Sequence, residues 1–251
     1  MDEQLKALRS SVEHLSAVVQ RIDPSKFGSP AYPTKWSIAD VLSHIGSGAV
    51  ILARRFDDIV ADRATDDGFN QSVWDEWNAK APPAQVADAL VADAAMLERL
   101  ESLPDDRRDH FQFPMGPMNL DFAGFVGLRL NEHALHTWDV EVTLDPSATL
   151  AIEEAGAVVD NLQMIVGFTG KPSGQVRDWH VRTVDPSRNF VLSFGPDSVE
   201  LSASGPDDHV DLEIPAESFV RLIYGRLDPN HTPSVVDGRD LDELRRAFPG
   251  I

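Results

Sequence analysis

The sequence contains no cysteine, and this absence excludes several kinds of chemistry at once. Without cysteine the chain forms no disulfide, no zinc site built on thiolates and no cysteine nucleophile. If this protein does thiol chemistry, the sulfur must arrive on a cosubstrate.

Basic residues are also scarce, since 22 Lys and Arg stand against 41 Asp and Glu, for a formal net charge of −19. Binding to the phosphate backbone of a nucleic acid requires clustered Lys and Arg, and an anionic membrane surface attracts the same residues. We therefore expect neither a nucleic acid nor a membrane as a partner. Acidity of this kind commonly serves solubility.

Long apolar runs are absent as well, because no stretch approaches the roughly 20 residues that a membrane-spanning helix needs. The first residues, Met1 to Gln4, are acidic where a signal peptide would be basic and then apolar. We therefore expect a cytoplasmic protein. Its content of 42% hydrophobic residues is enough for a sizeable core.

The part of the chain before Asp145 has helical patterns of apolar residues. Ser37 followed by Asp40 resembles a capping box, which predicts a helix start near Ile38. A shorter helix is expected around residues 74–77, and the charged, then Pro-, Met- and Gly-rich segment 105–119 is expected to be a loop. Four long helices are predicted, over about residues 5–22, 38–61, 84–103 and 120–142.

Asp145-Pro-Ser147 marks a predicted domain boundary, so we expect one domain over residues 1–147 and another over 148–251. After this boundary the pattern changes to alternating β-rich runs separated by Pro, Gly and Asp turns. The predicted strands cover 176–184, 190–194, 199–203, 210–214 and 234–236, and helices are predicted over about 152–168, 215–225 and 241–248. The expected fold class is α+β, with a four-helix bundle followed by a smaller α+β domain whose sheet is mainly antiparallel.

The most informative pattern is Glu132 and His136, four residues apart in the last of the four long helices. Residues at this spacing project from one helix face, and that face otherwise carries apolar residues such as Leu128 and Leu135. A carboxylate on such a face is costly unless it is paired or binds a metal. One helix can offer a carboxylate oxygen and an imidazole nitrogen to Zn²⁺ at this spacing. The alternative is a buried hydrogen-bond cluster that includes Asp139.

A catalytic zinc site typically takes three protein ligands and leaves one position open. His44 and His14 each lie on the flank of the apolar stripe of a predicted helix, and periodicity does not choose between them. Either can also be a structural histidine. His133 points about 100° away from Glu132 and is interpreted as peripheral. The other histidines show no ligand spacing: His110, His180, His209 and His231.

Two separated stretches resemble motifs of a known family, the mycothiol-dependent maleylpyruvate isomerases. Trp36-Ser-Ile-Ala-Asp-Val-Leu-Ser-His44-Ile is similar to the start of that family's second helix. Glu132-His-Ala-Leu-His136-Thr-Trp-Asp139 is similar to its fourth-helix motif. Near the C-terminus, Arg221-Leu-Ile-Tyr-Gly-Arg226 and Gly238-Arg-Asp-Leu…Phe248-Pro-Gly resemble the family's smaller α+β domain, so the resemblance covers nearly the whole chain.

The resemblance implies a DinB-like metal-binding bundle over residues 1–147. It implies His44, Glu132 and His136 as metal ligands, zinc as the usual ion and mycothiol as the thiol cosubstrate. It also implies that Arg226 binds a substrate carboxylate, although an arginine at this place can instead stabilise a helix C-terminus. Asp139, one turn beyond the ligands, is expected either to hold an imidazole N–H or to pair with a nearby cation.

These expectations describe a metal-dependent enzyme that uses a low-molecular-weight thiol for isomerisation or S-transfer on a small electrophile such as maleylpyruvate. Two other interpretations stay open at this stage: a non-catalytic metal- or ligand-binding module, and a hydrolase that activates water. The donor set of two nitrogens and one oxygen also accepts nickel, cobalt or iron. We expect a monomer or a weak homodimer.

Overall fold

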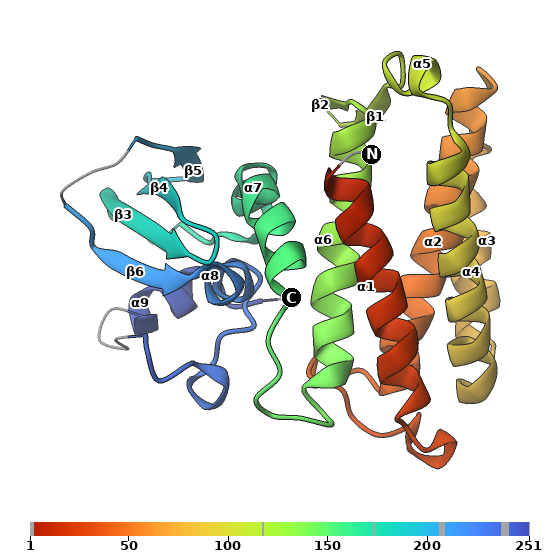
Figure 1. The fold of residues 1–251 in the computed structure, drawn as a ribbon, viewed down its shortest axis with the longest axis horizontal. Coiled ribbons are helices and arrows are strands. Elements are labelled where there is room, and N and C mark those ends of the chain that lie inside the picture. The colour runs from red at the N-terminus through yellow and green to blue at the C-terminus, as the bar shows by residue number, and fades with distance from the viewer. Residues whose placement is uncertain (1–2, 117, 173, 206–208, 237–240, 251) are drawn as a thin grey trace. The chain divides into compact units, whose positions relative to one another are not determined.

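A computed structural model describes residues 3–116, 118–172, 174–205, 209–236 and 241–250. The chain divides into two compact units, Met1–Ala148 and Thr149–Ile251. The first unit is mainly helical, and the second combines helices with a four-stranded sheet (Figure 1). The predicted α+β class is therefore confirmed. None of the described helices is long and apolar enough to cross a membrane.

Four long helices build the first unit: α1 (Glu3–Gln20), α2 (Ile38–Val60), α4 (Pro82–Ser102) and α6 (Phe122–Glu141). α1 packs against α4 and α6, and α2 packs against the same two helices, so the four close into a bundle. The four predicted long helices are confirmed. The shorter α3 (Phe69–Asn78) packs against α2, and a 3₁₀ turn, η1 (Pro24–Lys26), follows α1.

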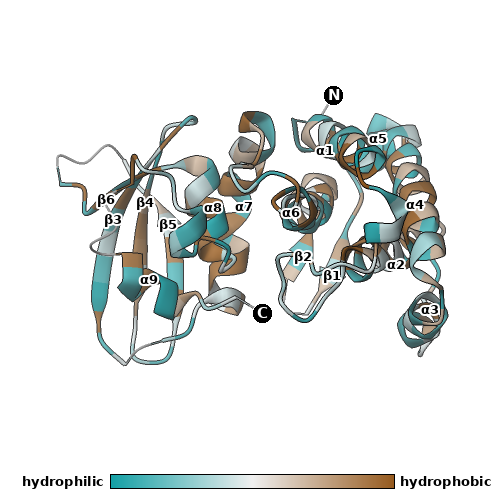
Figure 2. Ribbon diagram, turned by 90° about the horizontal axis from the view of Figure 1, so that it is seen from below, coloured by the Kyte–Doolittle hydropathy of each residue, from teal (hydrophilic) through white to brown (hydrophobic). Residues whose placement is uncertain are grey.

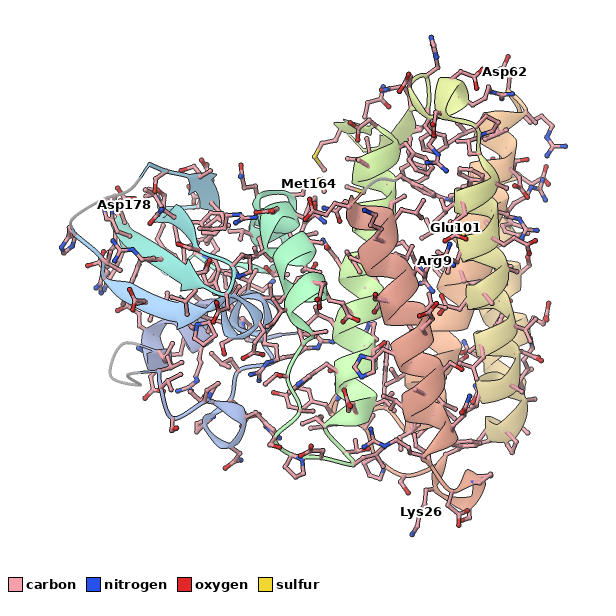
Figure 3. The ribbon with its side chains drawn as sticks, viewed as in Figure 1. Arg9, Lys26, Asp62, Glu101, Met164 and Asp178 are labelled. Atoms are coloured by element: carbon pink, nitrogen blue, oxygen red, sulfur yellow. The ribbon has the colours of Figure 1, made fainter. Side chains whose placement is uncertain are left out.

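Apolar side chains at helical spacing form the core of the bundle. Figure 2, which views the bundle from below, shows hydrophobic segments in brown on its long helices. Fully burying one such side chain contributes about 1.5–3 kcal/mol. At the bundle surface, Arg9 of α1 and Glu101 of α4 point toward each other and form an ion pair (Figure 3). Apolar burial therefore carries most of the stability, because exposed ion pairs contribute little.

Gly46 permits a close approach of three helices. A Cβ atom at this position would lie 2.3 Å from the ring of Trp77 in α3 and 2.8 Å from the Cα atom of Ala89 in α4. Only glycine fits at such distances without a shift of the neighbouring helices. The glycine in the middle of α2 is therefore a packing requirement.

α2 begins at a capping box, as the sequence predicts. The N–H of Asp40 donates to Ser37 Oγ at 3.1 Å, and the N–H of Ser37 donates to Asp40 Oδ2 at 2.8 Å. The loop before the cap is tied to α6, because the N–H of Tyr32 donates to the carbonyl of Asp139 at 3.1 Å. Together these bonds fix the first turns of α2, where His44 lies.

The segment 105–119 contains a short helix, α5 (Asp105–Arg108), and a hairpin of β1 (Phe113–Met115) and β2 (Met118–Leu120). The prediction of a loop was therefore wrong. Phe111 and Phe113 are buried, and their rings lie 5.3 and 4.8 Å from that of Phe125 in α6. Three-residue strands show too few positions for a periodic pattern, and it is this aromatic packing that fixes them.

The second unit has a sheet of strand order β5-β4-β3-β6. β3 pairs antiparallel with β4, β4 with β5, and β3 parallel with β6, so the predicted mainly antiparallel sheet is confirmed. α7 packs against α8 and β5. The elements are α7 (Ile152–Thr169), β3 (Arg177–Val184), β4 (Arg188–Phe194), β5 (Val199–Ala203), β6 (Leu212–Pro215), α8 (Ala216–Ile223), η2 (Pro229–His231) and α9 (Leu241–Ala247).

The strand predicted over residues 234–236 is wrong, because these residues form a turn and a bend. The segment contains two consecutive valines, Val235 and Val236, and valine has a high β-propensity. In the structure Val236 is buried while Val235 is 76% exposed, and neither pairs with any described strand. Propensity without a pairing partner does not make a strand.

Candidate metal centre

α2 and α6 bring His44, Glu132 and His136 together. One nitrogen of each histidine and one oxygen of Glu132 all lie within 4.8 Å of one another. His44 Nε2 lies 3.2 Å from Glu132 Oε2, and His136 Nε2 lies 3.7 Å from the same oxygen. Among the described residues no other group of three such side chains converges in this way.

The donor group faces solvent on one side. The side chains of His44 and Glu132 are 43% and 45% exposed, whereas that of His136 is 10% exposed. Two imidazole nitrogens and one carboxylate oxygen are donors that zinc commonly takes from proteins. The three residues therefore fit a divalent metal whose remaining coordination position stays open to a ligand.

Asp139 orients one of the two imidazoles. Its side chain is fully buried, and its Oδ2 lies 2.7 Å from Nδ1 of His136. A carboxylate only accepts hydrogen bonds, so Nδ1 carries the proton and the lone pair of a neutral His136 lies on Nε2. Such a partner fixes the tautomer and raises the basicity of the ligand. Of the two roles expected for Asp139, the structure has the contact to an imidazole.

Trp36 packs beside both histidines. Its ring centroid lies 5.7 Å from that of His136, at an interplanar angle of 25°, and 5.2 Å from that of His44. The two imidazoles meet edge to face at 4.7 Å. This packing restricts rotation of the two rings and holds their Nε2 atoms near Glu132.

His14, the alternative third ligand, lies outside the donor group. Its Nε2 is 3.0 Å from Oε2 of Glu141, near the end of α6. The other histidines with no predicted ligand role also have separate partners. Nδ1 of His110 donates a hydrogen bond to the carbonyl of Asp106. His209 pairs with Asp211, and His231 pairs with Asp228.

His133 lies outside the donor group, as its direction on α6 predicts, and it is fully buried inside the bundle. Its Nε2 lies 2.6 Å from Asp93 Oδ2, and its Nδ1 lies 2.8 Å from Ser11 Oγ. The other oxygen of Asp93 accepts from Arg129 at 2.6 Å, and Arg129 also donates to the carbonyl of Ile45. Four side chains from α1, α4 and α6 thus form a buried polar cluster.

The charges of this cluster act on the carboxyl of Asp93. Burial by itself raises the pKa of Asp93, but the neighbouring His133 and Arg129 and their hydrogen bonds lower it by more. The pKa of Asp93 therefore falls well below the usual range of a carboxyl. The cluster holds a carboxylate at the centre of the bundle, paired with a guanidinium.

Sequence reasoning missed this cluster, although two signals were present. Arg129 and His133 stand four residues apart on α6, as Glu132 and His136 do. Asp93 interrupts an apolar stripe of α4 that includes Ala89 and Met96. A buried acid and a buried base on facing helices predict an ion pair, once the helices are known to face each other.

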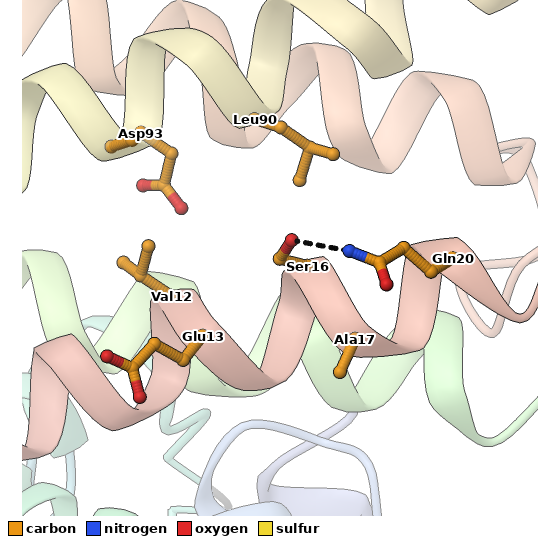
Figure 4. Close-up of a pocket in the computed structure, with 8 residues that line it drawn as sticks. Val12, Glu13, Ser16, Ala17, Gln20, Leu90 and Asp93 are labelled. Carbon is orange, nitrogen blue, oxygen red and sulfur yellow. Dashed lines mark hydrogen bonds between the residues drawn. The ribbon is translucent and has the colours of Figure 1, made fainter.

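The cluster borders a pocket of about 330 Å³ between α1 and α4, in which Asp93 is one of the lining residues (Figure 4). Ser11, His133 and Asp93 have the connectivity of a hydrolytic triad. Ser11, however, is fully buried and does not line the pocket. A substrate in the pocket does not reach this hydroxyl, so the cluster is structural.

Arg226, the predicted catalytic residue, lies in the second unit just after α8. Its Nη1 donates to the carbonyl of Tyr224, the C-cap residue of α8, at 3.0 Å. This contact fits the alternative of an arginine that stabilises a helix end, and a role toward a substrate stays a prediction. The preceding Gly225 has φ +69°, and a Cβ there would lie 2.2 Å from the backbone of Gly250, so the turn before Arg226 requires glycine.

Comparison with known families decides what kind of protein carries this centre. Residues 8–141 match a family model described as the mycothiol maleylpyruvate isomerase N-terminal domain. The match spans more than half of the chain. This protein belongs to that family. All three donors of the candidate metal centre, and Asp139, lie inside the matched segment.

Two solved structures of mycothiol-dependent maleylpyruvate isomerase are similar to this family member. One has a TM-score of 0.65 at 15% identity and covers 94% of this chain and 93% of its own. The other, a histidine-to-alanine mutant, has a TM-score of 0.63 at 15% identity, with 89% and 88% covered. At such low identity the likeness establishes the fold. A search of the curated proteins finds no match.

Proposed function

We propose that this family member is a metal-dependent enzyme that uses mycothiol, a low-molecular-weight thiol, for isomerisation or S-transfer on a small electrophile such as maleylpyruvate. The observation that carries the proposal is the convergence of His44, Glu132 and His136 from two helices, with one side open to solvent. Membership of the family supports the choice of thiol. The lack of cysteine agrees with a sulfur that arrives on a cosubstrate.

The proposed metal ligands are His44, Glu132 and His136, and the proposed metal is zinc. When bound, a divalent cation lowers the pKa of a coordinated thiol and thereby supplies a thiolate near neutral pH. The remaining roles belong to the chain. Asp139 keeps the proton of His136 on Nδ1, and Trp36 holds both imidazoles in place. We assign Arg226 to the carboxylate of the electrophile, where a planar guanidinium suits bidentate binding.

Elemental analysis of the untagged protein tests the metal centre first. We expect about one equivalent of zinc in the wild type and a loss of most of it in Glu132→Ala. Glu141→Ala is the matched control, because it removes a carboxylate from the same helix that pairs with His14 outside the donor group. Wild-type protein that takes up no metal after addition of Zn²⁺ would refute the proposal.

Turnover with free mycothiol tests the reaction. Formation of the trans isomer from maleylpyruvate indicates isomerisation, and a stable thioether indicates S-transfer. We expect His136→Ala to lose both metal and activity while its circular dichroism stays that of a folded protein. Cleavage of an ester or amide without any thiol would favour the hydrolase instead, and tight metal binding without turnover would favour a binding module.

A further inference from the structure

A pocket of about 290 Å³ adjoins the candidate metal centre. His44 lines this pocket and is also one of the three metal donors. The walls come from the loop before α2, from α2 and from α3. Two of the lining residues are tryptophans, Trp36 and Trp74. A molecule bound in this pocket would therefore reach one of the metal donors directly.

One face of α2 is polar along this pocket. Four residues of α2 line the pocket: Asp40, Ser43, His44 and Ser47. The last three lie three, four and seven residues after Asp40, which places all four on one side of the helix. Contact with solvent does not account for the polar residues on this face, because Ser43 and Ser47 are only 5% and 3% exposed. Buried hydroxyls that line a pocket are typical of a surface that binds a polar ligand.

The opposite wall is formed by α3. Trp74 is 43% exposed although tryptophan is a large apolar residue, and Asn78 lies one turn further along the same side. The buried Trp77 anchors the helix on α2 and α4 next to Gly46, which keeps this wall in place. The pocket thus combines two indole rings with an amide, a carboxylate, hydroxyls, an imidazole and the ammonium group of Lys35.

This combination suits a polyhydroxylated ring. The C–H bonds on the face of such a ring pack against the electron-rich face of an indole, and its hydroxyls bond carboxylate, amide and serine groups. Mycothiol carries its cysteine on a body of glucosamine and inositol, so it presents rings of this kind next to a thiol. The pocket lies at the lower end of the size range of ligand sites, which suits part of this body.

We infer that the pocket beside His44 binds the polyhydroxylated body of the thiol cosubstrate, so that the sulfur is directed to the metal centre. The inference rests on the proposed function and deepens it, since it assigns Trp74 and Asn78 to the recognition of the cosubstrate. A thiol without this body, such as N-acetylcysteine, gains nothing from either residue.

Calorimetric titration with S-methyl mycothiol tests the inference. This thioether keeps the body of the cosubstrate but forms no thiolate. We expect Trp74→Ala and Asn78→Ala each to raise the Kd about tenfold, equivalent to about 1.4 kcal/mol. Val91→Ala is the control, because it removes a side chain that is 71% exposed on α4 and does not line the pocket. Its Kd should equal that of the wild type.

The same titration of Glu132→Ala separates the pocket from the metal. We expect this variant to bind S-methyl mycothiol with an affinity close to that of the wild type. Absence of binding to the wild type, or an equal Kd in both pocket variants and the wild type, would overturn the inference. The proposed function is judged separately by zinc content and turnover of free mycothiol. Binding through the pocket without turnover would therefore refute only the function.

Discussion

Replacing Asp93 by asparagine tests whether the buried cluster stabilises the bundle. Both oxygens of Asp93 accept a short hydrogen bond, one from Arg129 and one from His133. An amide has one acceptor oxygen, so in Asp93→Asn one of these donors faces an NH₂ group. The substitution also leaves the guanidinium of Arg129 without its buried counter-charge.

The size of the effect follows from burial. The side chains of Arg129 and Asp93 are 3% and 2% exposed, so solvent screens their interaction very little. Removing one partner of a buried ion pair costs about 3–5 kcal/mol. Because asparagine keeps the shape and one acceptor, we expect a loss near the lower limit, about 3 kcal/mol. In a domain of this size that corresponds to a fall in Tm of roughly 6–12 °C.

Urea unfolding followed by circular dichroism at 222 nm measures the loss, since most helices lie in the bundle. Asp57→Asn is the matched control, because Asp57 of α2 pairs with Arg99 of α4 in an ion pair whose two side chains are 44% and 43% exposed. We expect this control to change the free energy of unfolding by less than about 1 kcal/mol. Equal losses in the two variants would refute the reasoning from burial.

The unfolding free energies of the wild type and of Asp93→Asn should also differ in their dependence on pH. The pKa of Asp93 is lower in the folded chain than the value of about 3.9 in an unfolded chain. The stabilisation from this carboxylate is therefore complete above that value and is lost as the pH falls below it. The difference in unfolding free energy between wild type and Asp93→Asn should shrink from pH 5 to pH 3. A constant difference would contradict the assignment.

Three further predictions concern the metal centre and the packing around it. Asp139→Asn should weaken zinc binding about 10–100-fold in competition with a chromophoric chelator, because His136 loses the partner that fixes its tautomer. Removal of the metal by chelation should lower the Tm, and Zn²⁺ at 100 times its Kd should restore about 2.7 kcal/mol, an effect absent from Glu132→Ala. In thermal unfolding, Gly46→Ala should destabilise the fold by about 1–3 kcal/mol, because the added Cβ overpacks the helix contact. Gly28→Ala is the control, because nothing lies within 4 Å of its Cβ, and its stability should stay within about 0.5 kcal/mol of the wild type.

Much of the architecture could be predicted from the sequence, because it depends on local regularity. Apolar residues at helical spacing define the four long helices, and Ser37 with Asp40 defines the start of α2. The pair of Glu132 and His136 is equally local, since a helix places residues four apart on one face whatever surrounds it. The lack of cysteine is also read from the sequence alone, and it means that any thiol used by this protein must come from a cosubstrate.

The tertiary structure alone decided which helices face each other. His14 and His44 occupy similar flanks of their helices, and only the packing of α2 against α6 places His44 beside Glu132. His133 has its partners on α1 and α4, and Trp74 forms a pocket wall because α3 packs on α2. Local sequence fixes the direction of a side chain relative to its own helix. The long-range packing of the helices determines what that side chain meets.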